Sequence, residues 1–83
     1  MKYKKKKKAY FFILSNKSIQ VNFFDGVNIL FYFCPKGIAY IPENIKDGIN
    51  IFPLNYNATF SEVDSEDPII NERIKYAINE IKK

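Results

Sequence analysis

Histidine is absent from this chain of 83 residues, and cysteine occurs only once, as Cys34. A single cysteine cannot form an internal disulfide, so no oxidising compartment is indicated. Without histidine, a metal centre of His and Cys ligands and a Cys–His or Ser–His–Asp catalytic set are both excluded. The acids Asp64 and Glu66 stand in a polar segment and are interpreted as solvated charges. We therefore expect no catalytic residue, no metal site and no cofactor in this chain.

Long apolar runs are also missing. The stretch AYFFIL, residues 9–14, is six residues long and continues into the polar SNKS. A secretory signal needs an apolar region of about 7–15 residues with a small-residue cleavage site, and a membrane helix needs about 20 apolar residues. The sequence therefore predicts neither, and we expect an intracellular domain that does not contact a membrane.

Positive charge is scarce outside the first eight residues. The formal net charge is +4, yet residues 1–8 contain six lysines, so that residues 9–83 sum to −2. The segment 43–83 alone sums to −3, with acids concentrated in SEVDSED. The body of the domain is therefore not the basic surface that a nucleic-acid-binding fold usually presents.

What the chain does contain is a series of short apolar and β-branched segments separated by turn residues. In SIQVNF, apolar and polar side chains alternate, which is typical of a half-buried strand. The SNK triplet and Asp25-Gly26 are hairpin signals, and Asn16 is the residue of that triplet best able to take a positive φ. Pro53 suits a strand end or a sheet edge. The predicted strands are 9–14, 18–23, 28–34, 38–41 and 49–54.

The last segment changes to a helical period. Apolar residues recur at spacings of three and four along one face of the predicted helix: Ile70, Ile74, Ala77, Ile78 and Ile81. Asp67 is a suitable N-cap and Pro68 a suitable first helical residue. We expect this helix to pack on the sheet face that carries Ile19, Val21 and Phe23. Strands followed by one helix define an α+β fold.

The predicted strands 9–14 and 28–34 are apolar on both faces. One helix of about 15 residues can cover only one face of a sheet, so the other face has to meet something else. The loop 55–66 could fold over it, but an interface with another protein is the better hypothesis. The candidate contact residues are Phe11, Ile13, Leu30 and Tyr32.

Three stretches of the chain resemble the polo-box family. ILSNKSIQVNFFDG resembles the family's Leu-Ser-Asn-Gly-type turn, Val-Gln-x-Asn-Phe strand and Asp-containing turn, while RIKYA and IAYI are similar to the helix and a later strand of the second polo box of polo-like kinases. The resemblance implies a single domain over residues 1–83 with a six-stranded antiparallel β-sheet (meander), followed by one C-terminal α-helix packed on one face. A further strand then precedes Ala9. It would place Tyr3 where polo boxes often carry Trp and make residues 4–8 strand. The remaining parts are the sheet 9–54, the loop 55–66 and the helix 67–82.

The resemblance implies a non-catalytic protein–protein interaction module. Polo boxes target polo-like kinases to centrosomes, centrioles or kinetochores during the cell cycle, and some dimerise or serve as scaffolds. In polo-like kinases two boxes pair, and a His and a Lys after the aspartate that matches Asp25 grip a phosphopeptide. Here Gly26 and Asn28 stand at those positions, and neither supplies a cation. We expect dimerisation or pairing with a second box rather than phosphopeptide binding.

The lysine run leaves an alternative open. It could be a disordered basic arm, a strand with solvated lysines, or an extension unrelated to the domain. The resemblance favours a strand, at least for the second half of the run. As an arm beside exposed aromatics such as Phe11, Phe24 and Tyr32, it would instead suit a small nucleic-acid-binding sheet. Against this alternative, the chain contains a single arginine and has an acidic C-terminal half.

Overall fold

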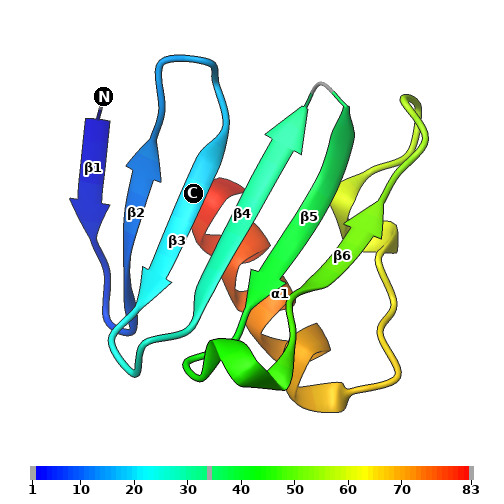
Figure 1. Ribbon diagram of the computed structural model, residues 1–83. Coiled ribbons are helices and arrows are strands. Elements are labelled where there is room, and N and C mark those ends of the chain that lie inside the picture. Colours follow the sequence, from blue (N-terminus) through cyan, green and yellow to red (C-terminus); the bar gives the residue numbers. More distant parts are fainter. Residues whose placement is uncertain (1, 34, 83) are drawn as a thin grey trace.

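The computed structural model describes residues 2–33 and 35–82. It contains one antiparallel sheet in which every strand pairs with its neighbours along the chain, and a helix that crosses one face (Figure 1). The predicted α+β meander is therefore confirmed. The elements are β1 (Lys2–Lys5), β2 (Ala9–Ile13), β3 (Ile19–Phe23), β4 (Asn28–Phe33), β5 (Lys36–Ile41), β6 (Asn50–Pro53), two short 3₁₀ helices, η1 (Ile45–Asp47) and η2 (Phe60–Glu62), and α1 (Pro68–Lys82).

The helix α1 lies behind the sheet in the view of Figure 1 and forms the core with the inward side chains of β2–β5. Ile74 is 2% exposed, and it packs with Val21 and Phe23 of the face predicted for the helix. The carboxylate of Asp67 accepts a hydrogen bond from the backbone N–H of Ile69 at 2.9 Å, as expected for the N-cap. The predicted packing fails only at the C-terminal end of α1, where Ile81 remains 37% exposed.

The N-terminal lysines are divided between a strand and a turn. β1 pairs with β2, with Lys4 opposite Phe11, so the strand implied before Ala9 exists. The expectation that the second half of the run is the strand is wrong, because the strand occupies residues 2–5 and residues 6–8 make the turn. The backbone N–H of Lys6 donates to the carbonyl of Ala9 at 2.9 Å, which closes this turn.

The turn between β2 and β3 corrects a second detail. The residue with positive φ is Lys17, at 69°, and not Asn16. Asn16 instead uses its side-chain oxygen to accept a hydrogen bond from the backbone N–H of Ser18 at 3.0 Å. This local bond fixes the turn through the asparagine side chain and moves the left-handed conformation one residue onward. Gly26 has φ 97° in the next hairpin turn, as the Asp-Gly signal indicated.

The loop 55–66 lies on the helix side of the sheet. Phe60 of η2 makes edge contacts with Phe31 and Phe33, at ring-centroid distances of 5.2 and 5.3 Å, and Phe31 belongs to the core under α1. Lys36 holds the loop in place, since its ammonium donates to the backbone carbonyl of Ala58 and lies 5.3 Å from the Phe60 ring. The alternative in which this loop covers the other face of the sheet is therefore not observed.

Candidate interaction surface

The sheet face opposite α1 is termed the open face. Because side chains alternate along each strand, the register of the ladders determines which residues share it. One cross-strand row runs over all six strands on this face. Its members are Tyr3, Phe12, Gln20, Leu30, Ala39 and Ile51. Five of the six are apolar or aromatic, so the row forms an apolar stripe across the open face. The neighbouring row on this face is more polar and consists of Lys5, Tyr10, Asn22, Asn28 and Ile41.

Aromatic rings occupy the half of the open face formed by β1 and β2. Tyr3 stacks on Phe12 at a centroid distance of 5.6 Å and lies 5.9 Å from Tyr10, which in turn meets Phe24 edge-on at 5.2 Å. Tyr3 is 61% exposed and Phe24 is 51% exposed. These rings contact one another across the strands, yet much of their surface remains available to a partner.

Smaller apolar side chains occupy the half formed by β4, β5 and β6. Ala39 is buried at 7%, whereas Ile51 on the edge strand is 56% exposed. Tyr32 lies across Gly37: a Cβ atom on that glycine would stand 2.6 Å from the tyrosine hydroxyl oxygen. Gly37 therefore makes room for Tyr32 to lie flat on the sheet. Between the two halves, the amide of Gln20 donates to the side chain of Asn22 at 2.8 Å.

The structure places the four candidate contact residues on opposite faces. Leu30 and Tyr32 lie half-buried on the open face. Phe11 is 6% exposed in the core, where its ring lies 6.4 Å from that of Tyr76, and is not available to a partner. Ile13 shares the helix side with Phe11 but lies beyond the cover of α1 and is 47% exposed. The four therefore do not form one patch.

The separation follows from strand parity. Odd-numbered positions of β2 and β4 face the helix and even-numbered positions face away. Two of the four candidates have odd numbers and two have even numbers. Tyr3, Tyr10 and Phe12 were missed as members of the open face. Once the helix is assigned to the face of Val21, the pairing of Phe11 with Val21 places Tyr10 and Phe12 on the opposite face.

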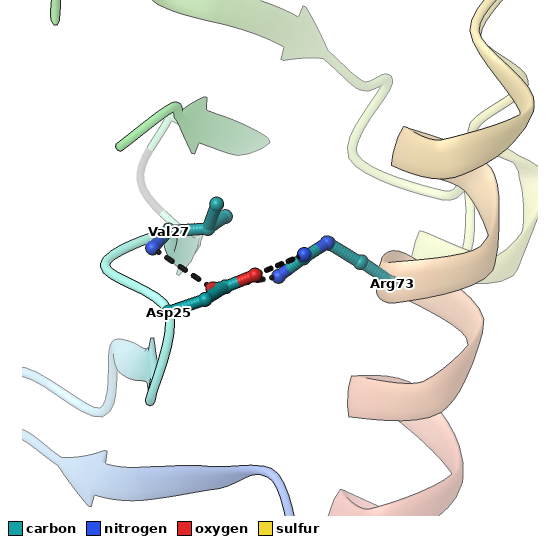
Figure 2. A network of polar contacts seen from close by, with 3 residues as sticks. All are labelled: Asp25, Val27 and Arg73. Carbon is teal, nitrogen blue, oxygen red and sulfur yellow. Dashed lines mark hydrogen bonds and ion pairs between the residues drawn. The ribbon is translucent and has the colours of Figure 1, made fainter. Parts of the chain in front are cut away.

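The turn after β3 is held by an ion pair with the helix. Figure 2 shows the carboxylate of Asp25 directed at the guanidinium of Arg73, which donates to both carboxylate oxygens, one bond measuring 3.1 Å. The same carboxylate accepts from the backbone N–H of Val27 at 3.3 Å. The hydrogen bond from Arg73 lowers the pKa of Asp25, and the carboxylate correspondingly raises the pKa of Arg73. Asp25 therefore joins this turn to α1.

Gly26 and Asn28 bring no cation to this turn. Gly26 packs against Glu43, whose Cγ would lie 2.9 Å from a Cβ at that position. Asn28 begins β4 and pairs with Asn22 and Ile41. Arg73 of α1 is matched by Asp25, and Lys7 and Lys8 line the hollow beside this pair. Gly26 and Asn28 themselves therefore offer no cationic contact to a phosphate group.

The described residues offer no sign of a metal site or a membrane span. Among residues 2–33 and 35–82, no group of three or more His, Cys, Asp or Glu side chains could hold a metal ion. No helix in the same part of the chain is long and apolar enough to cross a membrane.

Comparison with known proteins gives one family. The family model described as POLO box duplicated region matches residues 6–66, which is more than half of the chain. The matched segment runs from the turn after β1 to the loop before α1 and so contains β2–β6. No curated protein and no solved structure matches the chain.

Proposed function

The chain belongs to the polo-box family, and we propose that it pairs with a second polo box through its open face. Polo boxes are non-catalytic modules that bind proteins, so a protein partner is the family's property. The pairing itself is our proposal. It is supported by the apolar cross-strand row of the open face. The helix α1 covers only the other face of the sheet and leaves this row uncovered.

The dimensions of the molecule suit such an interface. The molecule measures 28 by 28 by 21 Å, so one sheet face offers roughly the 800 Å² per partner that stable complexes bury. Burial of apolar surface contributes about 25 cal/mol per Å². Contact with a second apolar face would therefore be favourable, because it would bury the exposed rings of Tyr3 and Phe24 and the side chain of Ile51.

A second copy of this chain is the simplest partner. A two-fold axis would bring the same patch from both copies together, which requires no other surface. A neighbouring box in a longer protein would use the same face. In either case we propose that the module dimerises or targets a polo-like kinase or a scaffold of centrioles or kinetochores, and that it acts in the cell cycle at those intracellular structures.

Phosphopeptides are not the proposed ligand. The turn 25–28 carries no free cation from Gly26 or Asn28, and its aspartate is engaged by Arg73. Titration with matched phosphorylated and unphosphorylated peptides should show little difference in affinity once salt screens the lysines. A preference that persists at high salt and perturbs the NMR signals of Gly26 would contradict this prediction.

Sedimentation velocity over a range of concentrations tests the pairing. The double variant Leu30→Glu/Tyr32→Glu places charges on the open face and should sediment as a monomer where the natural sequence forms pairs. Ile69→Glu is the matched control, because Ile69 is 59% exposed on the helix side and should leave the pair intact. If the natural sequence stays monomeric at high micromolar concentration, the proposal of self-pairing is wrong.

Single-stranded nucleic acid is a second candidate, favoured by one observation. The rings of Tyr3, Tyr10, Phe12 and Phe24 form a contiguous cluster, and such clusters stack bases in single-strand-binding folds. Lys5 shares this face. Binding to mixed-sequence RNA at physiological salt, lost on Tyr3→Ala, would favour this function over pairing.

A further inference from the structure

Two adjoining hollows flank the C-terminal end of α1 on the helix side of the sheet. One, of about 370 Å³, lies between that end of α1 and β1–β3. The other, of about 360 Å³, lies between it and β4 with η2. Ile19 and Ile81 line both hollows, so the two adjoin, and we term them together the helix-end groove.

The floor of the helix-end groove is apolar and open to solvent. Ile13 is 47% exposed, Phe33 is 42% exposed and Ile81 is 37% exposed. Ile74 and Ala77 of α1 are buried at 2% and 0% exposure, whereas the apolar side chains around the last turn described, near Lys82, are not. Exposed apolar surface gathered at one place in this way marks a contact site more often than chance.

The rim of the helix-end groove is positively charged. Among the residues that the structure describes, no acidic side chain lines the two hollows, and five lysines do: Lys2, Lys4, Lys6, Lys36 and Lys82. Glu80 is close by and pairs with Lys6 at 3.7 Å. These six residues together carry a charge of four, which equals the net charge of +4 of the whole chain. The other charged residues sum to zero, so these six residues account for a charge equal to that of the whole chain.

Part of this charge is unmatched. Lys36 is occupied by the carbonyl of Ala58, and Lys6 by Glu80. Within residues 2–33 and 35–82, no ion pair involves Lys2, Lys4 or Lys82. An anionic partner would therefore find available ammonium groups on β1, at one end of the groove, and at the end of α1, between the two hollows.

We propose that the helix-end groove binds an acidic amphipathic segment of a partner protein. Its apolar side chains fill the two hollows, and its carboxylates meet Lys2 and Lys4 on one side and Lys82 on the other. This inference goes beyond the proposed pairing, because the groove is on the sheet face opposite to the open face. A domain that pairs through one face and binds an acidic segment through the other would join two partners.

The dimensions of the groove define the segment. The groove extends from β1 to β4, which is three inter-strand steps of about 4.8 Å, or about 14 Å. A helix rises about 1.5 Å per residue, so apolar side chains about seven to ten residues apart on one helix face would reach both hollows.

A second copy and a lipid surface fit this groove less well. The acidic segment 62–67 of a second copy has one apolar residue, Val63, which is packed against the core and cannot anchor in a hollow. A lipid surface contacts side chains that protrude, whereas the floor residues here line hollows. An acidic segment matches both the shape and the charge.

Fluorescence anisotropy with a synthetic peptide tests the proposal. The probe is a fluorescein-labelled helical peptide of about four turns, with Leu on one face and Glu on the other. We expect it to bind the domain, and two control peptides, with Gln for Glu or with Ser for Leu, to bind at least about tenfold more weakly.

Protein variants locate the site. Lys2→Gln/Lys4→Gln and Ile13→Gln should each weaken binding of the acidic peptide by about tenfold. The matched controls Lys46→Gln/Lys75→Gln and Ile45→Gln, which carry the same chemical changes away from the groove and from the open face, should stay within about twofold. Thermal unfolding of each variant confirms that it is folded.

Three results would overturn the inference. If Lys2→Gln/Lys4→Gln and Lys46→Gln/Lys75→Gln weaken peptide binding equally, the attraction comes from the overall charge of the protein and not from the groove. Binding to phosphatidylserine vesicles that Ile13→Gln abolishes, without binding of the peptide, would assign the groove to a membrane. A loss of peptide binding in Leu30→Glu/Tyr32→Glu would place the peptide on the open face. If Leu30→Glu/Tyr32→Glu still binds the peptide, the groove acts independently of the open face. This inference can then be judged separately from the pairing, whatever the sedimentation experiment shows.

Discussion

The ion pair between Asp25 and Arg73 links stability to pH at the level of single side chains. Arg73 lowers the pKa of Asp25 below its ordinary value of 3.8, so the native state holds this proton less tightly than the unfolded chain does. The pair therefore stabilises the fold at pH values above 3.8, and this contribution disappears as the carboxylate is protonated at lower pH.

Replacement of Asp25 by asparagine should reproduce the acid effect at neutral pH. The aspartate side chain is 52% exposed, and ion pairs with such exposure contribute about 1 kcal/mol or less. We expect Asp25→Asn to lower the free energy of unfolding at pH 7 by that amount and to match the natural sequence near pH 2, as measured by urea unfolding. A constant difference at all pH values would show that the variant acts through the turn and not through the charge.

Gly37 is required by the side chain that lies across it. A Cβ at this position would stand 2.6 Å from the hydroxyl oxygen of Tyr32 and 2.9 Å from the carbonyl oxygen of Phe52. We expect Gly37→Ala to reduce the free energy of unfolding by about 1–3 kcal/mol, as overpacking of a filled site usually does. Denaturant unfolding measures this cost, and the second change Tyr32→Ala should recover part of it. No recovery would assign the whole effect to the backbone of β6.

At the level of elements, the helix depends on a few buried contacts. Ile74 is 2% exposed beneath the sheet, whereas Ile69 on the same helix is 59% exposed. Truncation of a buried isoleucine to alanine typically costs about 2–5 kcal/mol, so Ile74→Ala should unfold the domain far more easily in urea. Ile69→Ala, the control, should change the free energy of unfolding by about 0.5 kcal/mol or less. Equal effects would mean that α1 is not anchored through Ile74.

The elements with a clear period were predictable from the sequence. The spacing of Ile70, Ile74 and Ala77, with Asp67 and Pro68 at the start, indicated α1, and the alternation in SIQVNF indicated β3. β1 has no such signal, because KYKK contains one apolar residue and its strand conformation comes from pairing with β2. Only the resemblance to polo boxes indicated a strand there, and its implied extent over residues 4–8 is wrong, because β1 ends at Lys5.

The sequence predicted that one apolar face of the sheet is uncovered, but not which residues share that face. Two-faced apolar strands implied an uncovered face, and that face exists. Which residues share it depends on the register between strands and on the side that the helix takes, and neither is encoded by the composition of one strand. Of the candidate contact residues, Leu30 and Tyr32 lie on the open face, whereas Phe11 belongs to the core.

For the whole molecule, pairing would appear as a stability that depends on concentration. A pair stabilises the folded state by mass action, so its melting temperature should rise as the protein is concentrated. Differential scanning calorimetry at several concentrations measures the shift. We expect the natural sequence and Ile69→Glu to show it, and Leu30→Glu/Tyr32→Glu to melt at one temperature throughout. A flat series for the natural sequence would contradict self-pairing.

The order of the strands also bears on the synthesis of the protein. Since every strand pairs with the one before it, the hairpins can form one after another as the chain leaves the ribosome. The helix that covers their core is synthesised after the six strands, from Pro68 onward. Until then both faces of the growing sheet are exposed to solvent. A nascent chain that stalls between β6 and α1 would therefore be a natural client for chaperones that bind apolar surface.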